Sequence, residues 1–136
     1  MVAPRGLTKQ PRLASLFLVC SDLRKSADFY QQLGFSCHEK KSRSSVFSLG
    51  DGLQLHLHEP LSPDEEDTFG LTTGRGSTCL VQSYEVENLE DLALRADSDS
   101  VVYGPNTTEW GQRLMIVTDP DGHRLEFRER PPGSAT

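Results

Sequence analysis

The chain of 136 residues is long enough for one domain with a hydrophobic core and too short for two domains of ordinary size. Its formal net charge of −6 argues against a nucleic-acid partner, which would need clustered lysine and arginine, and no apolar run approaches the ~20 residues that span a bilayer. The N-terminus has basic residues but no apolar segment after them, so we expect no secretory signal and a cytoplasmic protein.

The first half of the chain predicts one helix and four strands in the order β-α-β-β-β. An apolar run rich in strand-forming residues is followed by Ser21-Asp22, a helix N-cap signal, and Gly34 is placed to end that helix. The turn Gly50-Asp51-Gly52 predicts a hairpin between the last two strands. The expected elements are a strand at 13–20, a helix at 23–33, and strands at 35–41, 44–49 and 53–58.

Residues 60–76 separate this pattern from a second one. The segment holds two prolines, three glycines and the acidic cluster D-E-E-D, so we expect a loop or linker there. Beyond it the pattern restarts, with Asn88 as the helix cap and D-P-D-G (119–122) as the last hairpin turn. The expected elements are a strand at 78–86, a helix from 89 to about 97, and strands at 101–103, 112–118 and 124–128.

The two halves can be superimposed by their helix caps and their last hairpin turns. Such a repeat predicts two copies of one supersecondary unit that share a core. The overlay places four strand positions in two equivalent pairs, Ser15 with Val81 and His56 with Glu126. If both sheets curve around one centre, all four positions point toward it, because residues on a strand alternate between its two faces.

Three segments carry a resemblance to a known superfamily. They are S-D-L-R-K-S-A-D-F-Y-Q-Q-L-G-F (21–35), G-D-G-L-Q-L-H-L-H-E-P (50–60) and D-P-D-G-H-R-L-E-F (119–127). In this order they resemble the vicinal oxygen chelate superfamily, which includes glyoxalase I, extradiol dioxygenases, fosfomycin-resistance transferases and bleomycin-resistance proteins. The resemblance implies an α+β fold in which two βαβββ modules in tandem form a cupped mixed sheet.

The implied domain covers residues 13–130, between an N-terminal tail (1–12) and a C-terminal tail (131–136). Within it we expect module one at about 13–59, the acidic linker at about 60–76, and module two at about 77–130.

Metal-using members of the superfamily take four ligands from positions that correspond here to Ser15, His56, Val81 and Glu126. Valine cannot ligate a metal, and a serine hydroxyl is a poor ligand beside imidazole or carboxylate. We therefore expect no cofactor. The alternative is a metal-dependent lyase, dioxygenase or thiol transferase that holds a divalent metal ion with His56, Glu126 and His58. A third alternative is a cofactor-free enzyme with His56 as general base beside Glu126. Without a metal, His56 is also a candidate donor to Glu126.

The segment E-W-G-Q-R (109–113) is similar to the W-G-x-R-E-F signature of bleomycin-resistance-type members, and departs from it at Leu114-Met115. Those members sequester a drug without transforming it. Trp110 offers a flat apolar face for a planar ligand, and the planar fork of Arg113 suits an anionic or carbonyl group. The alternatives are core packing for Trp110 and a surface ion pair for Arg113. Phe69, an aromatic residue in a polar loop, suggests a lid or a dimer contact.

The leading expectation is thus a non-catalytic protein of bleomycin-resistance type, which binds and sequesters an antibiotic-like planar or heteroaromatic small molecule. We expect a homodimer, with neither nucleic acid nor membrane as partner. The similar family members often form such dimers by exchanging an N-terminal strand or a module. The expected ligand-binding residues are Trp110, Arg113, His56, Glu126, Phe47, Ser15, Val81, Met115 and Phe69.

Overall fold

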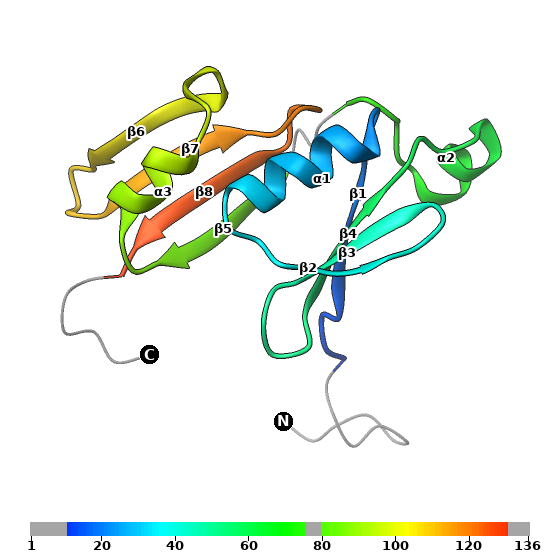
Figure 1. Cartoon of the computed structure of the whole chain (residues 1–136), viewed down its shortest axis with the longest axis horizontal. Helices are drawn as coiled ribbons and strands as arrows, with labels where there is room; N and C mark the ends of the chain where they lie inside the picture. The colour runs from blue at the N-terminus through cyan, green and yellow to red at the C-terminus, as the bar shows by residue number, and fades with distance from the viewer. Residues whose placement is uncertain (1–10, 76–79, 131–136) are drawn as a thin grey trace.

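Two four-stranded mixed sheets form the framework of the protein, and a helix packs on one face of each (Figure 1). The computed structural model describes residues 11–75 and 80–130. The strand order is β1-β4-β3-β2 in one sheet and β5-β8-β7-β6 in the other. In both sheets the first strand runs parallel to the fourth, and the remaining pairs are antiparallel. The predicted α+β fold with two βαβββ modules is therefore confirmed.

The described elements of module one are β1 (Ser15–Val19), α1 (Leu23–Gln32), β2 (Cys37–Lys40), β3 (Ser44–Ser48) and β4 (Gln54–His58). A further helix, α2 (Pro63–Phe69), follows. Module two contains β5 (Val81–Val86), α3 (Leu89–Arg95), the 3₁₀ turn η1 (Ser98–Ser100), β6 (Val101–Thr107), β7 (Arg113–Thr118) and β8 (Arg124–Glu129). None of the helices among the described residues has the length and apolar character that a membrane span requires. The predicted C-terminal tail, most of the N-terminal tail and positions 76–79 lie outside the described residues.

The register of the two sheets confirms the internal repeat. Ser15 on β1 lies opposite Gln54 on β4, and Val81 on β5 lies opposite Arg124 on β8. His56 lies two residues after Gln54 on β4, and Glu126 lies two residues after Arg124 on β8. The predicted pairs of equivalent positions are therefore equivalent in the structure as well.

The segment predicted to be only a loop or linker contains helix α2, so that prediction was wrong for residues 63–69. Ser62 caps the helix: its hydroxyl accepts from the backbone N–H of Glu65, and the Glu65 carboxylate accepts from the backbone N–H of Ser62. Proline in the first turn and the acidic residues that follow favour this helix start. Gly70 ends the helix in the left-handed conformation, with φ 70°. The acidic cluster therefore belongs to a helix N-terminus.

Strand β6 is longer than the predicted 101–103 because it continues through Gly104-Pro105 to Thr107. β6 is an edge strand, where a proline that lacks an N–H donor is tolerated. A Cβ atom at Gly104 would lie 2.5 Å from the carbonyl oxygen of Leu114 on β7. The close approach of the two strands thus requires glycine at this position.

Among the described residues, a hydrophobic core lies between the two sheets and helices α1 and α3 and contains residues from both modules. Leu55 and Leu57 enter it from β4, and Leu125 and Phe127 enter it from β8. Two residues predicted to line a ligand pocket belong to this core instead. Phe47 and Met115 are both fully buried, because strand alternation turns them toward the helices and away from the opposite sheet face.

Buried hydrogen bonds join the two modules around Tyr30 of α1. Its hydroxyl donates to the Asp119 carboxylate at 2.9 Å and accepts from the Gln82 side-chain amide at 3.2 Å. The same carboxylate accepts from the backbone N–H groups of Asp121 and His123, at 2.9 Å each. Burial, followed by the charge of Asp119, raises the pKa of Tyr30 well above its ordinary value, so the hydroxyl keeps its proton and remains a donor.

We expect Tyr30→Phe to lower the free energy of unfolding by about 1–3 kcal/mol, because it leaves a buried carboxylate oxygen and a buried amide without this partner. Urea denaturation monitored by circular dichroism measures the change. The matched control is Tyr103→Phe at an exposed position, which should stay within ~0.5 kcal/mol of the unchanged protein. An equal decrease in the free energy of unfolding in the two variants would contradict a role for this hydrogen bond in joining the modules.

Candidate functional site

Each sheet has a face that points away from its packed helix, and most of the predicted polar site residues lie on these two faces. On β4, Leu55 and Leu57 enter the core, so His56 and His58 lie on the opposite face. On β8, Leu125 and Phe127 enter the core, so Glu126 lies on the opposite face. We call these surfaces the open faces of module one and module two.

The two histidines on the open face of module one are half-buried and have partners nearby in the chain. His56 Nε2 lies 3.1 Å from the side-chain oxygen of Gln54, and His58 Nδ1 lies 2.7 Å from the backbone oxygen of Glu59. Ser15 is exposed on β1 of the same sheet. These contacts hold both imidazole rings at the sheet surface.

Glu126 accepts a hydrogen bond from Ser83, whereas the sequence offered His56 as a candidate donor. Ser83 lies directly opposite Glu126 in the β5–β8 register, and its hydroxyl donates to the carboxylate at 2.9 Å. The Arg128 guanidinium lies 3.5 Å from the same carboxylate oxygen. His56 belongs to the other sheet. Module two therefore supplies the partners of Glu126 from its own strands.

Within residues 11–75 and 80–130, no group of three or more His, Cys, Asp or Glu side chains is placed to hold a metal ion. His56 and His58 share one open face, whereas Glu126 lies on the other sheet. Val81 occupies its predicted strand position, exposed and with no ligating atom. The three residues of the alternative metal set are thus not brought together within the described part of one chain.

Aromatic side chains gather on the open face of module one. The rings of Phe17 on β1 and Phe69 on α2 stack with centroids 6.0 Å apart and planes inclined by 24°. The centroid of the Phe17 ring also lies 5.2 Å from the centroid of the His58 ring. Phe17 is 38% exposed and Phe69 is 61% exposed. We call Phe17, His58 and Phe69 the aromatic face.

Phe17 was not among the predicted site residues, although strand alternation signals its position. Leu16 and Leu18, its neighbours on β1, pack against or within the core. Phe17 must therefore point toward the opposite face.

Helix α2, which carries Phe69, is anchored to the sheet by ion pairs of Arg43. The guanidinium donates to Glu65 on α2 through two nitrogens, at 2.9 Å each, and to Glu59 at 2.5 Å. The hydrogen bonds from Arg43 lower the pKa of Glu65 to about 2, so this carboxylate is ionised at neutral pH. The position of Phe69 is therefore set by a capped and anchored helix.

Trp110 lies in the turn between β6 and β7 and is 77% exposed, which rules out the alternative of core packing. It borders a surface hollow of about 460 Å³ whose other lining residues are Thr107, Gly111, Gln112, Arg113, Glu129 and Arg130. Arg113 forms an ion pair with Glu90 of α3, as its alternative reading predicted. This hollow contains neither Glu126 nor His56.

The predicted site residues are therefore distributed over three surfaces and the core. The open face of module one carries Ser15, His56, His58 and Phe69; that of module two carries Val81 and Glu126; the hollow carries Trp110 and Arg113; and the core contains Phe47 and Met115. These surfaces expose aromatic side chains next to polar groups that already have hydrogen-bond or ion-pair partners. Such a combination suits the binding of a flat molecule by stacking.

Comparison with solved structures identifies proteins of the same fold. A glyoxalase-related enzyme from Fulvimarina pelagi has a TM-score of 0.70 and 21% identity, over 90% of this chain and 90% of its own. TnmS3, an antibiotic binding protein from Streptomyces sp. CB03234, has a TM-score of 0.67 and 20% identity, over 90% and 98%. A bleomycin resistance determinant encoded on the transposon Tn5 has a TM-score of 0.59 and 20% identity, over 91% and 99%.

At these identities the likeness extends to the fold, while membership of a family rests on the sequence itself. Residues 12–127 match the family model described as Glyoxalase/Bleomycin resistance protein/Dioxygenase superfamily. That span includes both modules and the segment that joins them. The chain belongs to the glyoxalase/bleomycin resistance protein/dioxygenase superfamily.

Proposed function

We propose that this protein binds and sequesters a small planar or heteroaromatic molecule of antibiotic-like chemistry without transforming it. The observation that carries the proposal is that the aromatic rings of Phe17, Phe69 and Trp110 are exposed outside the core. Removing apolar area from water is favourable by roughly 25 cal/mol per Å². Exposed rings of this size therefore favour a flat apolar partner. The antibiotic binding protein and the bleomycin resistance determinant among the solved relatives, by their names, support this class of function.

The aromatic face is the surface best built for stacking. Phe17 is held by β1 and Phe69 by the anchored helix α2, so little freedom remains to be lost when a ligand binds. A flat ligand that lies on the exposed side of Phe69 extends the existing stack of rings. His56 and Gln54 supply polar groups on the same sheet face. Trp110 in its hollow is the second candidate contact.

We further propose that two copies of the chain form a homodimer through their open faces. Leu13, Leu80 and Val81 are exposed apolar residues at or just before the first strand of each module, and both of these strands are sheet edges. Exposed edges and apolar patches are commonly covered by pairing. If module one of one copy faces module two of the other, the aromatic face is placed opposite the open face that carries Glu126.

We expect Phe69→Ala to weaken the binding of a heteroaromatic antibiotic of the bleomycin type about three- to tenfold, because it removes one stacking ring. Isothermal titration calorimetry measures the affinity, and Phe69→Leu, which keeps apolar volume but removes the ring, is the matched variant.

Trp110 is the only tryptophan in the chain, so its fluorescence reports whether the hollow takes part in ligand binding. Absence of binding across a panel of such antibiotics, with the protein folded, would reject the proposal. A loss confined to Trp110→Ala would move the site to the hollow.

We expect a bound antibiotic to be recovered chemically unchanged. We also expect Glu126→Gln to change the affinity of the protein for this antibiotic by no more than about twofold, because the carboxylate already accepts a hydrogen bond from Ser83. Mass spectrometry of the ligand after prolonged incubation checks the first point. Elemental analysis of protein purified without chelators checks whether a metal takes part. About one metal ion per chain, lost in Glu126→Gln, would favour the metal-dependent alternative. A modified ligand would show that the protein is an enzyme.

We expect sedimentation equilibrium at micromolar concentration to give twice the mass of one chain. Val81→Asp should shift the protein toward monomer, because it places a charge on an exposed apolar edge strand. Leu94→Asp, at an exposed position on α3 away from the open faces, is the control and should remain dimeric. A monomeric unchanged protein would refute dimerisation, and dissociation by Leu94→Asp alone would place the contact on the helix side.

A further inference from the structure

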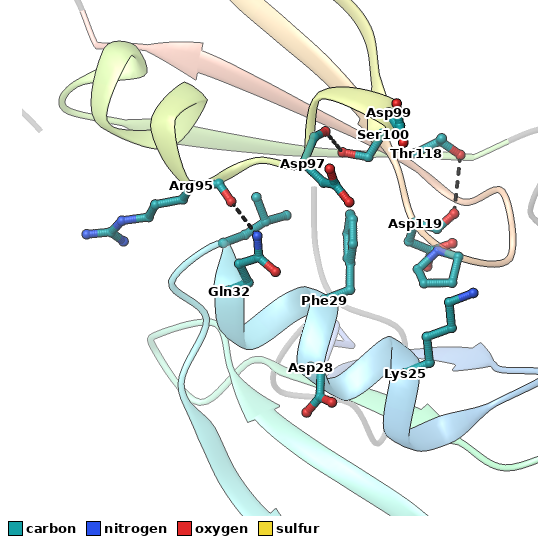
Figure 2. A pocket seen from close by; sticks show the side chains of 12 residues that line it. Lys25, Asp28, Phe29, Gln32, Arg95, Asp97, Asp99, Ser100, Thr118 and Asp119 are labelled. Carbon is teal, nitrogen blue, oxygen red and sulfur yellow. Dashed lines mark hydrogen bonds between the residues drawn. The ribbon is translucent and has the colours of Figure 1, made fainter.

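A second concave surface lies on the helix side of the protein, at the junction of the two modules. It is a groove of about 390 Å³ between α1 and the segment that connects α3 to β6 (Figure 2). The D-P-D-G turn between β7 and β8 closes one end of it. Since α1 and α3 pack on the sheet faces opposite the open faces, this groove is a different surface from the aromatic face and from the Trp110 hollow.

Phe29 supplies apolar surface to the groove, whose other lining residues are mostly polar or charged. Figure 2 shows the Phe29 ring rising from α1 into the space between Asp97 and Asp119. The ring is half-buried and contacts Tyr30 edge-on, with centroids 5.5 Å apart, so it is held by the core below it. Leu33 and Pro120 add apolar surface to the lining. The groove therefore offers a flat aromatic surface of restricted mobility.

Hydrogen bonds between the modules pin the groove on both sides of Phe29. The Gln32 side-chain amide on α1 donates to the backbone oxygen of Arg95 at 2.9 Å. On the other side, the Tyr30 hydroxyl donates to Asp119 at 2.9 Å. Both bonds cross from module one to module two, so the two walls are held at a fixed separation. A preformed groove loses little conformational entropy when it binds a ligand.

The charges around the groove favour a positively charged occupant. Asp97 and Asp99 lie on the module-two rim, both exposed, and among the described residues neither carboxylate forms an ion pair. The Arg95 guanidinium points away from the groove, while the Lys25 ammonium lies at the opposite end, near Asp119 (Figure 2). The rim beside Phe29 is thus negative, and an aromatic face attracts a cation through its quadrupole.

We propose that this groove binds a small organic cation with a flat apolar part, of the aryl-amidinium or aryl-guanidinium class. The flat part lies against Phe29, and the cationic group lies between that ring and the carboxylates of Asp97 and Asp99. The aromatic ring, the fixed walls of the groove and the exposed carboxylates thereby all contact one ligand molecule. The site is independent of the function proposed for the aromatic face.

Benzamidine hydrochloride is the probe for this site, with neutral benzamide as its uncharged analogue. In ¹H–¹⁵N correlation spectra at low ionic strength, we expect benzamidinium to shift the amide signals of α1 and of residues 95–100 selectively. Asp97→Asn/Asp99→Asn should weaken binding roughly three- to tenfold, as expected for the loss of two solvent-exposed charge pairs. Phe29→Leu should weaken it by a similar factor, as expected for an exposed cation–π contact. Benzamide should bind more weakly than benzamidinium.

The control for general electrostatics is Asp64→Asn/Asp67→Asn, which makes the same change in net charge on exposed positions of α2. We expect it to leave the affinity for benzamidinium within about twofold, since screened charges at a distance contribute little. Equal weakening by the two double variants would overturn the proposal, because binding would then depend only on net charge. Shifts confined to β1, β4 and α2 would also overturn it and would assign benzamidinium to the aromatic face.

Discussion

The arrangement of the two modules depends on a buried hydrogen bond between the Tyr30 hydroxyl and the Asp119 carboxylate. Burying a carboxylate is costly unless its oxygens find donors, and here two backbone N–H groups and one phenol supply them. The phenol comes from α1 of module one, whereas the carboxylate comes from the last hairpin turn of module two. The hydrogen bond forms only when the two modules adopt this relative position. Apolar packing around it is non-directional and specifies that position less strictly.

Strand alternation then divides each sheet into a side that holds the fold together and a side available for function. Phe47 and Met115 are of the residue types expected in an apolar pocket, but their strand positions turn them into the core. Phe17 is of the same type and points outward for the same reason. A shift of one residue along a strand thus separates a packing residue from a candidate ligand contact. The residue type alone does not distinguish the two.

The fold of this superfamily is shared by relatives named as a glyoxalase-related enzyme, a resistance determinant and an antibiotic binding protein. The fold therefore does not determine which of these activities a member has, and the activity depends on the side chains at each surface. On the open faces, the polar groups of His56 and Glu126 have partners within their own sheets, while aromatic rings are exposed. On the helix side, a rigid groove combines an aromatic ring with exposed carboxylates. These surfaces present different chemistry and can act independently.

The sequence by itself determined the repeat, the order of the strands and helices, and the family. These features rest on local signals: the caps at Asp22 and Asn88, the turn glycines, and the alternation of Leu55 and Leu57 with polar residues. The signal for α2 was equally local, since Ser62 and Glu65 form a capping box, but the proline and acidic content of the segment obscured it.

Only the tertiary structure decided which predicted residues lie together. His56 and Glu126 are equivalent in the repeat, yet equivalence in sequence does not bring two positions into contact when the modules join through their helix sides. The groove beside Phe29 had no signal in the sequence, because its walls come from segments far apart in the chain. These segments meet through the Gln32 and Tyr30 hydrogen bonds, which join residues 63 and 89 positions apart. Periodicity and turn residues report the conformation of neighbouring residues, whereas a site assembled across two modules depends on how those modules pack.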